Sequence, residues 1–186
     1  YIEDANDAPT DIWADRALSV AENSANGTVV GIFSRADQDA GDGATYSLIN
    51  NTTPFALSGA TLVVNGALNY EAATSYNLTV RVTDSYGAYY DEAFSVAVGN
   101  LNEAPTDLWP DRTLNFNENT AINSGIAWIG GADPDGGALT YSLLNDTGGR
   151  FAVRSDGLLM TGGTMLDYEN GGGSYSLLVR ATDAGG

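Results

Sequence analysis

The stretch Ala8-Pro9-Thr10-Asp11-Ile12-Trp13 returns 96 residues later as Ala104-Pro105-Thr106-Asp107-Leu108-Trp109. Other matched segments follow in the same order, at offsets of 95 to 99: Glu22-Asn23 with Glu118-Asn119, Asp37-Gln38-Asp39 with Asp133-Pro134-Asp135, Thr45-Tyr46-Ser47-Leu48 with Thr140-Tyr141-Ser142-Leu143, Asn69-Tyr70-Glu71 with Asp167-Tyr168-Glu169, and Arg81-Val82-Thr83-Asp84 with Arg180-Ala181-Thr182-Asp183. The period is too long for a solenoid, whose units run ~20–50 residues. The 186 residues therefore predict two tandem modules, with bounds 1–99 and 100–186.

Both modules are predicted to be all-β. Apolar residues alternate with polar ones over 76–83, which is the period of a half-buried strand. The remaining strand candidates are 11–20, 28–33, 44–49, 55–57, 61–64, 94–98 and 175–181. No helical period extends over ten residues. Six or seven short strands in about 100 residues favour a Greek-key β-sandwich.

The second module is predicted to lack its last strand. After Thr83-Asp84 the first module continues through a strand candidate that ends at Val98, whereas after Thr182-Asp183 the second stops within three residues. A missing strand leaves unpaired backbone groups along its neighbour. We therefore expect this edge to be frayed or paired with another chain.

The composition excludes several classes of chemistry. All 7 basic residues are Arg, 24 residues are acidic, the net charge is −17, and Lys, His and Cys are absent. This inventory excludes thiolate and Ser–His nucleophiles, lysine Schiff bases and ordinary structural zinc sites. The charge opposes long contacts with nucleic acid or anionic lipid, and no apolar run approaches the ~18 residues of a membrane span. Only carboxylate catalysis would remain, and the acids are clustered rather than isolated in pairs, so we expect no enzyme.

The acidic residues gather in the segments that lead into each module and at strand ends. Asp4-Ala5-Asn6-Asp7-Ala8-Pro9 precedes the first module, and Asn100-Leu101-Asn102-Glu103-Ala104-Pro105 joins the two. Clustered carboxylates repel one another unless they are solvated, partly protonated or bridged by a cation. With only oxygen ligands, the cation would be Ca²⁺ or Mg²⁺. An EF-hand is excluded, because Gly41 and Leu48 stand where that loop needs ligands.

The recurring motifs together resemble those of tandem cadherin-like repeats of the bacterial kind. These motifs are the linkers, the Glu-Asn pairs, the Asp-x-Asp pairs, the Asn/Asp-Tyr-Glu segments and the Thr-Asp steps. Each motif alone is weak, but they occur in one order in both modules. The resemblance implies a seven-stranded Greek-key sandwich in each module. It also implies Ca²⁺ at the junction between consecutive modules, typically up to three ions.

Carried over residue by residue, the resemblance implies the following junction ligands: Glu22, Glu71, Asn100, Asn102, Glu103, Asp133, Asp135 and Asp183. Asn69 and Glu103 replace the family's usual Asp, so two ions are expected more readily than three. A half-site at the start of the first module would comprise Asn6, Asp7, Asp37, Asp39 and Asp84. A weak half-site at the end of the second would comprise Glu118, Asp167 and Glu169.

The resemblance implies an extracellular or bacterial cell-surface segment that Ca²⁺ stiffens and that mediates attachment. Further cadherin-like modules are expected before and after it, with a homophilic or cell-surface partner. The alternative is a carbohydrate-binding accessory module of a polysaccharide-degrading protein. Trp13 and Trp109 discriminate between the two, since buried indoles favour the spacer and exposed indoles favour sugar. We expect both indoles to be packed.

Overall fold

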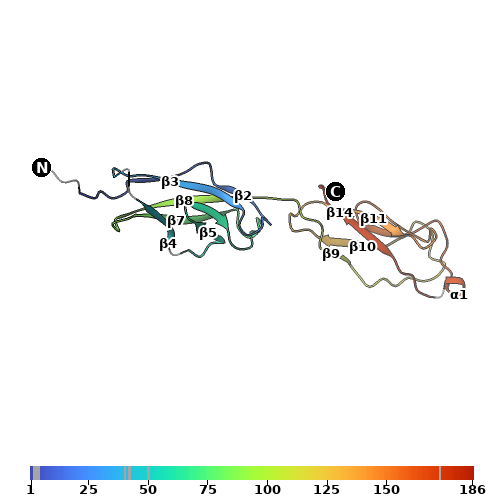
Figure 1. Cartoon of the computed structure of the whole chain (residues 1–186). Coiled ribbons are helices and arrows are strands. Elements are labelled where there is room, and N and C mark those ends of the chain that lie inside the picture. Colours follow the sequence, from blue (N-terminus) through green and yellow to red (C-terminus); the bar gives the residue numbers. More distant parts are fainter. Residues whose placement is uncertain (2–4, 40, 42, 50, 172) are drawn as a thin grey trace. The chain divides into compact units, whose positions relative to one another are not determined.

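The computed structural model describes residues 1, 5–39, 41, 43–49, 51–171 and 173–186, and the expected linker acid Asp4 lies outside them. The chain divides into two compact units, unit 1 (Tyr1–Leu101) and unit 2 (Asn102–Gly186). Each unit is built from strands, as Figure 1 shows. The expectation of an all-β chain is confirmed.

Unit 1 is a sandwich of two sheets. The strands are β1 (Asp11–Ala14), β2 (Ser19–Ala21), β3 (Val29–Ala36), β4 (Ala44–Ile49), β5 (Phe55–Ser58), β6 (Thr61–Val64), β7 (Ser75–Asp84) and β8 (Tyr89–Gly99). One sheet has the order β1-β3-β6-β5 and the other the order β2-β8-β7-β4. The inward residues of both sheets form one core around Phe55, Leu62 and Val80.

Unit 2 repeats this plan with fewer strands. Its strands are β9 (Asp107–Pro110), β10 (Gly125–Ala132), β11 (Thr140–Asn145), β12 (Phe151–Val153), β13 (Leu158–Thr161) and β14 (Leu178–Thr182). The sheet β12-β13-β10-β9 corresponds to β5-β6-β3-β1, but the second sheet contains β11 and β14 alone among the described residues. A four-residue helix, α1 (Tyr168–Gly171), lies between β13 and β14.

The single strand expected over 11–20 is wrong. β1 pairs antiparallel with β3 in one sheet, whereas β2 pairs parallel with β8 in the other. The chain must therefore cross between the sheets at residues 15–18, which interrupts the strand. The last strand of unit 1, expected to run through Tyr89 to Val98, is confirmed as β8, which pairs with β7 from Tyr89 onward.

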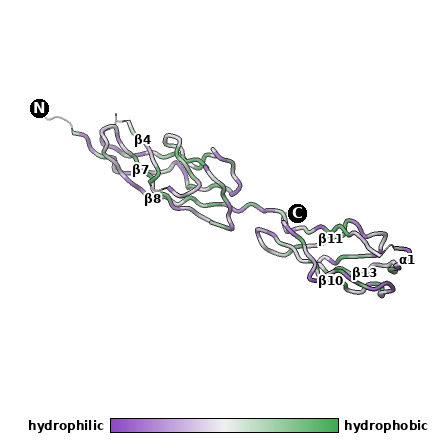
Figure 2. Tube along the Cα trace, turned by 90° about the horizontal axis from the view of Figure 1, so that it is seen from below, coloured by the Kyte–Doolittle hydropathy of each residue, from purple (hydrophilic) through white to green (hydrophobic). Residues whose placement is uncertain are grey.

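The open edge of unit 2 has a visible consequence for its core. Val80 and Val82 of β7 are fully buried, whereas the corresponding Val179 and Ala181 of β14 are only half-buried. A cavity of about 400 Å³ lies beside this edge, lined in part by Phe116. Residues 174–177 belong to no strand. Figure 2 shows hydrophobic residues gathered along the strands of each unit. Pairing of this edge with another chain stays a prediction.

Candidate metal centre

An acidic cluster lies at the end of unit 1 where the chain enters it, and we call it the leading cluster. It consists of Asn6, Asp7, Asp37, Asp39 and Asp84. The Asn6 side-chain amide donates to Asp84 Oδ2 at 3.0 Å. The Asp7 main-chain N–H donates to Asp39 Oδ2 at 2.7 Å, and the Asp39 N–H donates to Asp37 Oδ1 at 3.1 Å. The incoming segment is thus tied to the loop after β3 and to the end of β7.

Unit 2 has the same network at matched positions, and its leading cluster consists of Asn102, Glu103, Asp133, Asp135 and Asp183. The Asn102 amide donates to Asp183 Oδ2 at 2.9 Å. The Glu103 N–H donates to Asp135 Oδ2 at 2.5 Å, and the Asp135 N–H donates to Asp133 Oδ1 at 3.0 Å. Two copies of one hydrogen-bond pattern show that both sequence motifs build the same local structure.

Several carboxylate oxygens in these clusters are buried without a hydrogen-bond donor. Among the described residues these are Asp37 Oδ2, Asp133 Oδ2 and Asp135 Oδ1. A buried polar atom without a partner costs about 1–3 kcal/mol, and more when it is charged. In unit 2 the unsatisfied oxygens of Asp133 and Asp135 therefore favour a bound cation, whereas in unit 1 the oxygen of Asp37 has a cationic side chain nearby.

The two leading clusters differ in one neighbour. In unit 1, Arg35 Nε lies 3.3 Å from Asp37 Oδ2, and both side chains are largely buried, with 13% and 3% of their surface exposed. The corresponding residue in unit 2 is Gly131, which lies opposite Leu108 as Arg35 lies opposite Ile12. Arg35 therefore supplies unit 1 with positive charge for which unit 2 has no counterpart at this position. Sequence reasoning assigned no role to Arg35, although an arginine two residues before Asp37 is a usable signal for an ion pair.

A second acidic group, the trailing group, lies at the opposite end of unit 1 and consists of Glu22 and Glu71. Glu22 is fully buried, and its two carboxylate oxygens accept main-chain N–H groups from Leu101 and Tyr70, each at 2.8 Å. A carboxylate oxygen of Glu71 lies within 4.8 Å of one of Glu22. Glu71 and Asn100 are both exposed.

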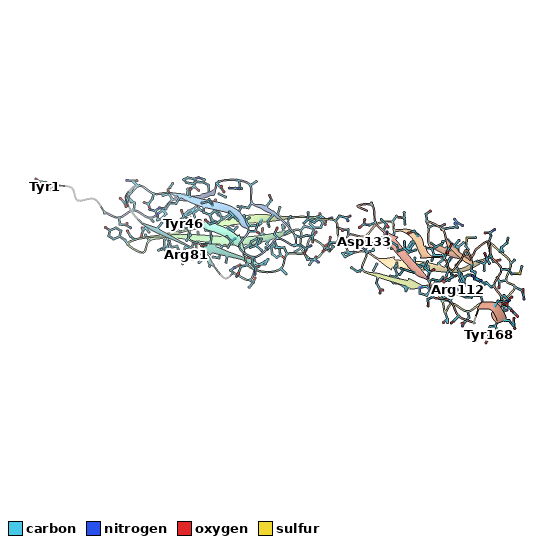
Figure 3. All side chains as sticks on the ribbon, turned by 45° about the vertical axis from the view of Figure 1, so that its right-hand side comes forward. Tyr1, Tyr46, Arg81, Arg112, Asp133 and Tyr168 are labelled. Carbon is cyan, nitrogen blue, oxygen red and sulfur yellow. The ribbon has the colours of Figure 1, made fainter. Side chains whose placement is uncertain are left out.

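The trailing group of unit 2 consists of Glu118, Asp167 and Glu169, which offer carboxylate oxygens within 4.8 Å of one another. Glu118 Oε2 accepts the Tyr168 N–H at 3.0 Å, as Glu22 accepts that of Tyr70. Glu118 is nevertheless exposed, whereas Glu22 is buried. Figure 3 shows Asp133 and Tyr168 at opposite ends of unit 2, so the leading and trailing groups of this unit are separate.

Hydrogen bonding keeps two cluster acids ionised. The side-chain amide of Asn102, with main-chain N–H groups of Gly186 and Gly185, lowers the pKa of Asp183 below its ordinary value. Burial alone would raise the pKa of Asp84, but the Asn6 amide and main-chain N–H groups outweigh burial and lower it. Both carboxylates therefore hold their negative charge at lower pH than an ordinary Asp does.

The donor set fits a hard cation. The side chains named in the clusters offer carboxylate and amide oxygens, and most of them stand on loops and linker segments. Ca²⁺ takes six to eight such oxygens in a flexible geometry, whereas Mg²⁺ demands a near-ideal octahedron and retains water. The clusters therefore suit Ca²⁺ better.

The expectation that Trp13 and Trp109 are packed is wrong. These residues expose 45% and 47% of their surface, and Trp128, on the neighbouring strand β10, exposes 45%. All three lie on outward positions of their sheets. The period-2 pattern alone could have placed them outward, since Ile12 and Leu108 occupy the adjacent inward positions.

Comparisons with known proteins match one unit to a family of domains and both units to a known fold. Residues 16–98 match the model of the family described as Cadherin domain. The resemblance to tandem cadherin-like repeats is confirmed.

Solved cadherin structures share the fold. The extracellular cadherin domains 1–5 of protocadherin gamma B2 match with a TM-score of 0.66 at 19% identity, over 97% of this chain and 40% of that one. The protocadherin gammaB7 EC3-6 cis-dimer structure matches with a TM-score of 0.62 at 23% identity, over 88% of this chain and 43% of that one. Human protocadherin-24 EC1-2 matches with a TM-score of 0.68 at 23% identity, over 96% of this chain and 94% of that one. The chain thus spans less than half the length of the first two.

No helix among the described residues is long and apolar enough to cross a membrane.

Proposed function

We propose that this chain is a pair of extracellular cadherin-type modules that bind Ca²⁺ at their acidic ends and become stiff when they do so. In this role it is an adhesion or spacer segment of a bacterial surface or secreted protein. The proposed ligands at the junction are those named from the sequence, with Glu22 and Glu71 from unit 1 and the leading cluster from unit 2.

The observation that carries this proposal is the set of buried, unsatisfied carboxylate oxygens in the leading clusters. Asp133 Oδ2 and Asp135 Oδ1 have no hydrogen-bond donor among the described residues. The acids of unit 2 that pair with Arg112 and Arg154 are Asp111 and Asp156, which lie outside the cluster. A bound cation would supply the missing charge and coordinate these oxygens.

Chain connectivity supports a shared site. The N–H of Leu101 donates to Glu22 within unit 1, and the N–H of Glu103 donates to Asp135 within unit 2. One residue separates these two donors, and two residues of extended chain span at most about 7 Å. If ligands come from both units, binding energy adds to the stability of the connection between them. Loss of Ca²⁺ is then expected to loosen the linker.

A Ca²⁺ titration followed by calorimetry and small-angle scattering tests this function. Ca²⁺ is expected to raise the melting temperature and to increase the radius of gyration, and EDTA is expected to reverse both changes. The double variant Glu103→Ala, Asp135→Ala should lose both responses. Asp156→Ala, which removes an exposed acid of unit 2 with no place in a cluster, is the matched control and should keep them. A calcium-loaded sample that EDTA leaves unchanged would contradict the proposal.

The attachment role rests on the cadherin fold. A homophilic or cell-surface partner is the proposed ligand of the stiffened segment. Sedimentation velocity with and without Ca²⁺ would detect self-association. If the protein stays monomeric at high concentration in Ca²⁺, the homophilic role is contradicted and the spacer role still stands.

A further inference from the structure

Unit 2 presents two exposed tryptophans side by side on the outer face of the sheet β12-β13-β10-β9. Trp109 of β9 lies opposite Gly130 of β10, and Trp128 lies two residues before Gly130 on the same face. Such diagonal neighbours have their Cα atoms about 7–8 Å apart, within reach of large aromatic side chains. The two residues expose 47% and 45% of their surface. Two large indoles therefore form one surface that is not covered by the unit itself.

Gly130 allows the indole of Trp109 to lie against the sheet. A Cβ atom at position 130 would stand 3.1 Å from indole Nε1 and 3.2 Å from Cε2, closer than ordinary contact. One face of the ring thus rests on the strand, and the other is available to solvent. Leu158 of β13 lies opposite Trp128 and continues the apolar surface. The result is a flat apolar platform.

An ion pair between Asp111 and Arg112, which carries no net charge, borders this platform. Asp111 and Trp128 are joined by two hydrogen bonds, from the Asp111 N–H to the Trp128 carbonyl at 2.8 Å and from the Trp128 N–H to Asp111 Oδ1 at 3.0 Å. Arg112 donates to both carboxylate oxygens of Asp111, at 3.1 and 2.9 Å. The guanidinium lowers the pKa of Asp111, so the Asp111 carboxylate stays ionised beside Arg112. Arg112 is 63% exposed, and in Figure 3 it lies away from the end of the unit that carries Asp133.

We propose that this Trp109–Trp128 face binds a neutral polysaccharide made of pyranose rings. A pyranose ring offers an apolar face of C–H groups for an indole, and hydroxyl groups at its rim can both donate to Asp111 and accept from Arg112. The exposed indole surface is roughly 230 Å², well below the ~800 Å² per partner of a stable protein interface, and suits a small flat ligand. A polyanion is disfavoured by the net charge of −17.

Unit 1 provides an internal control, because it carries part of the same arrangement. Trp13 is 45% exposed, and Asp15 pairs with Arg16 at 2.6 Å and accepts the Ile32 N–H at 2.8 Å. Ile32 stands where unit 2 has Trp128, and Ser34 stands where it has Gly130. This face therefore has one indole where unit 2 has two, and it should bind more weakly. The proposal does not depend on the proposed Ca²⁺ sites.

The test is affinity electrophoresis of the whole chain in gels containing soluble β-1,3-glucan, β-1,4-xylan or galactan, with EDTA present. At least one of these neutral polymers should retard the chain. Trp109→Ala and Trp128→Ala should each lower the affinity about tenfold, while Trp13→Ala should change it less than about threefold because unit 1 lacks the second indole. Ile32→Trp should raise the affinity by adding an indole to unit 1. Melting curves of every variant verify that it is folded.

Three results would overturn the proposal. The first is that none of the three polymers retards the chain. The second is retardation that survives both Trp109→Ala and Trp128→Ala in folded protein. The third is self-association, measured by sedimentation, that the same two variants abolish while polymer binding is absent, which would identify the face as a protein interface instead.

Discussion

Replacing Asp133 with Asn distinguishes a cation ligand from a structural acid. Asp133 Oδ1 accepts the Asp135 N–H at 3.0 Å, and an amide oxygen can accept the same bond. Asp133 Oδ2 is buried without a donor among the described residues, so the substitution removes a buried negative charge and little else. In EDTA, Asp133→Asn should therefore be at least as stable as the parent, by up to about 1–2 kcal/mol.

In Ca²⁺ the order should reverse. One ion at a free concentration a hundred times its dissociation constant adds about 2.7 kcal/mol. For a domain the size of unit 2, residues 102–186, each kcal/mol shifts the melting temperature by about 4–8 °C. Ca²⁺ should thus raise the melting temperature of the parent by roughly 10–20 °C. Asp133→Asn lacks one charged ligand and should lose most of this shift.

Differential scanning calorimetry of the whole chain measures both effects, since two units can melt in two transitions. Asp156→Asn is the matched control: it removes the same charge from an exposed ion pair with Arg154, and such a pair contributes little to stability. It should keep the full Ca²⁺ shift. The reasoning is refuted if Asp133→Asn melts below the parent in EDTA and still responds fully to Ca²⁺.

Three further predictions address the other clusters. Arg35→Ala leaves the buried Asp37 without its ion-pair partner, so in EDTA unit 1 should lose about 3 kcal/mol of its free energy of unfolding. Equilibrium unfolding should show that Ca²⁺ restores this stability, and an equal loss in both conditions would contradict the prediction. Glu22→Gln replaces one of the two accepting oxygens with an NH₂ group, which cannot accept the main-chain N–H that faces it. Unit 1 should therefore lose about 1.5–3 kcal/mol of stability, measured by urea unfolding. An unchanged urea midpoint would show that the two hydrogen bonds to the carboxylate contribute little. Asn102→Ala should raise the pKa of Asp183 toward its ordinary value in a carboxyl NMR titration. The stability due to the lowered pKa is present above about pH 4 and is lost as the pH falls through the folded value, so the variant should show a smaller acid-induced loss.

The repeat and its alternating strands were predictable because the information is local. The period-2 pattern over 76–83 matches β7 within one residue at each end, since both neighbours of β7 are present and the strand is half-buried throughout. The resemblance to cadherin-like repeats, rather than spacing alone, grouped the residues that come together within each leading cluster. Asn102 donates to Asp183 and Glu103 donates to Asp135, and all four residues stand in motifs that recur in both modules.

Features that depend on packing between distant segments were not predictable. The break between β1 and β2 follows from the chain crossing between two sheets, and no residue in the segment announces it. The different burial of Glu22 and Glu118 is not written in their identical Glu-Asn motifs. Glu22 accepts the N–H of Leu101, which lies 79 residues further along the chain.

The contrast between Arg35 and Gly131 shows why two matched clusters need not behave alike. In unit 1 the arginine already offsets part of the cluster's negative charge. Unit 2 has no room for such a solution, because a Cβ at Gly131 would stand 2.7 Å from a methyl group of Leu139 and 3.0 Å from one of Leu108. Its unsatisfied oxygens can be neutralised only by something that is not a side chain at this position. Unit 2 should therefore depend on Ca²⁺ more strongly than unit 1, and the order of the two Ca²⁺-induced melting shifts is the direct measure of that difference.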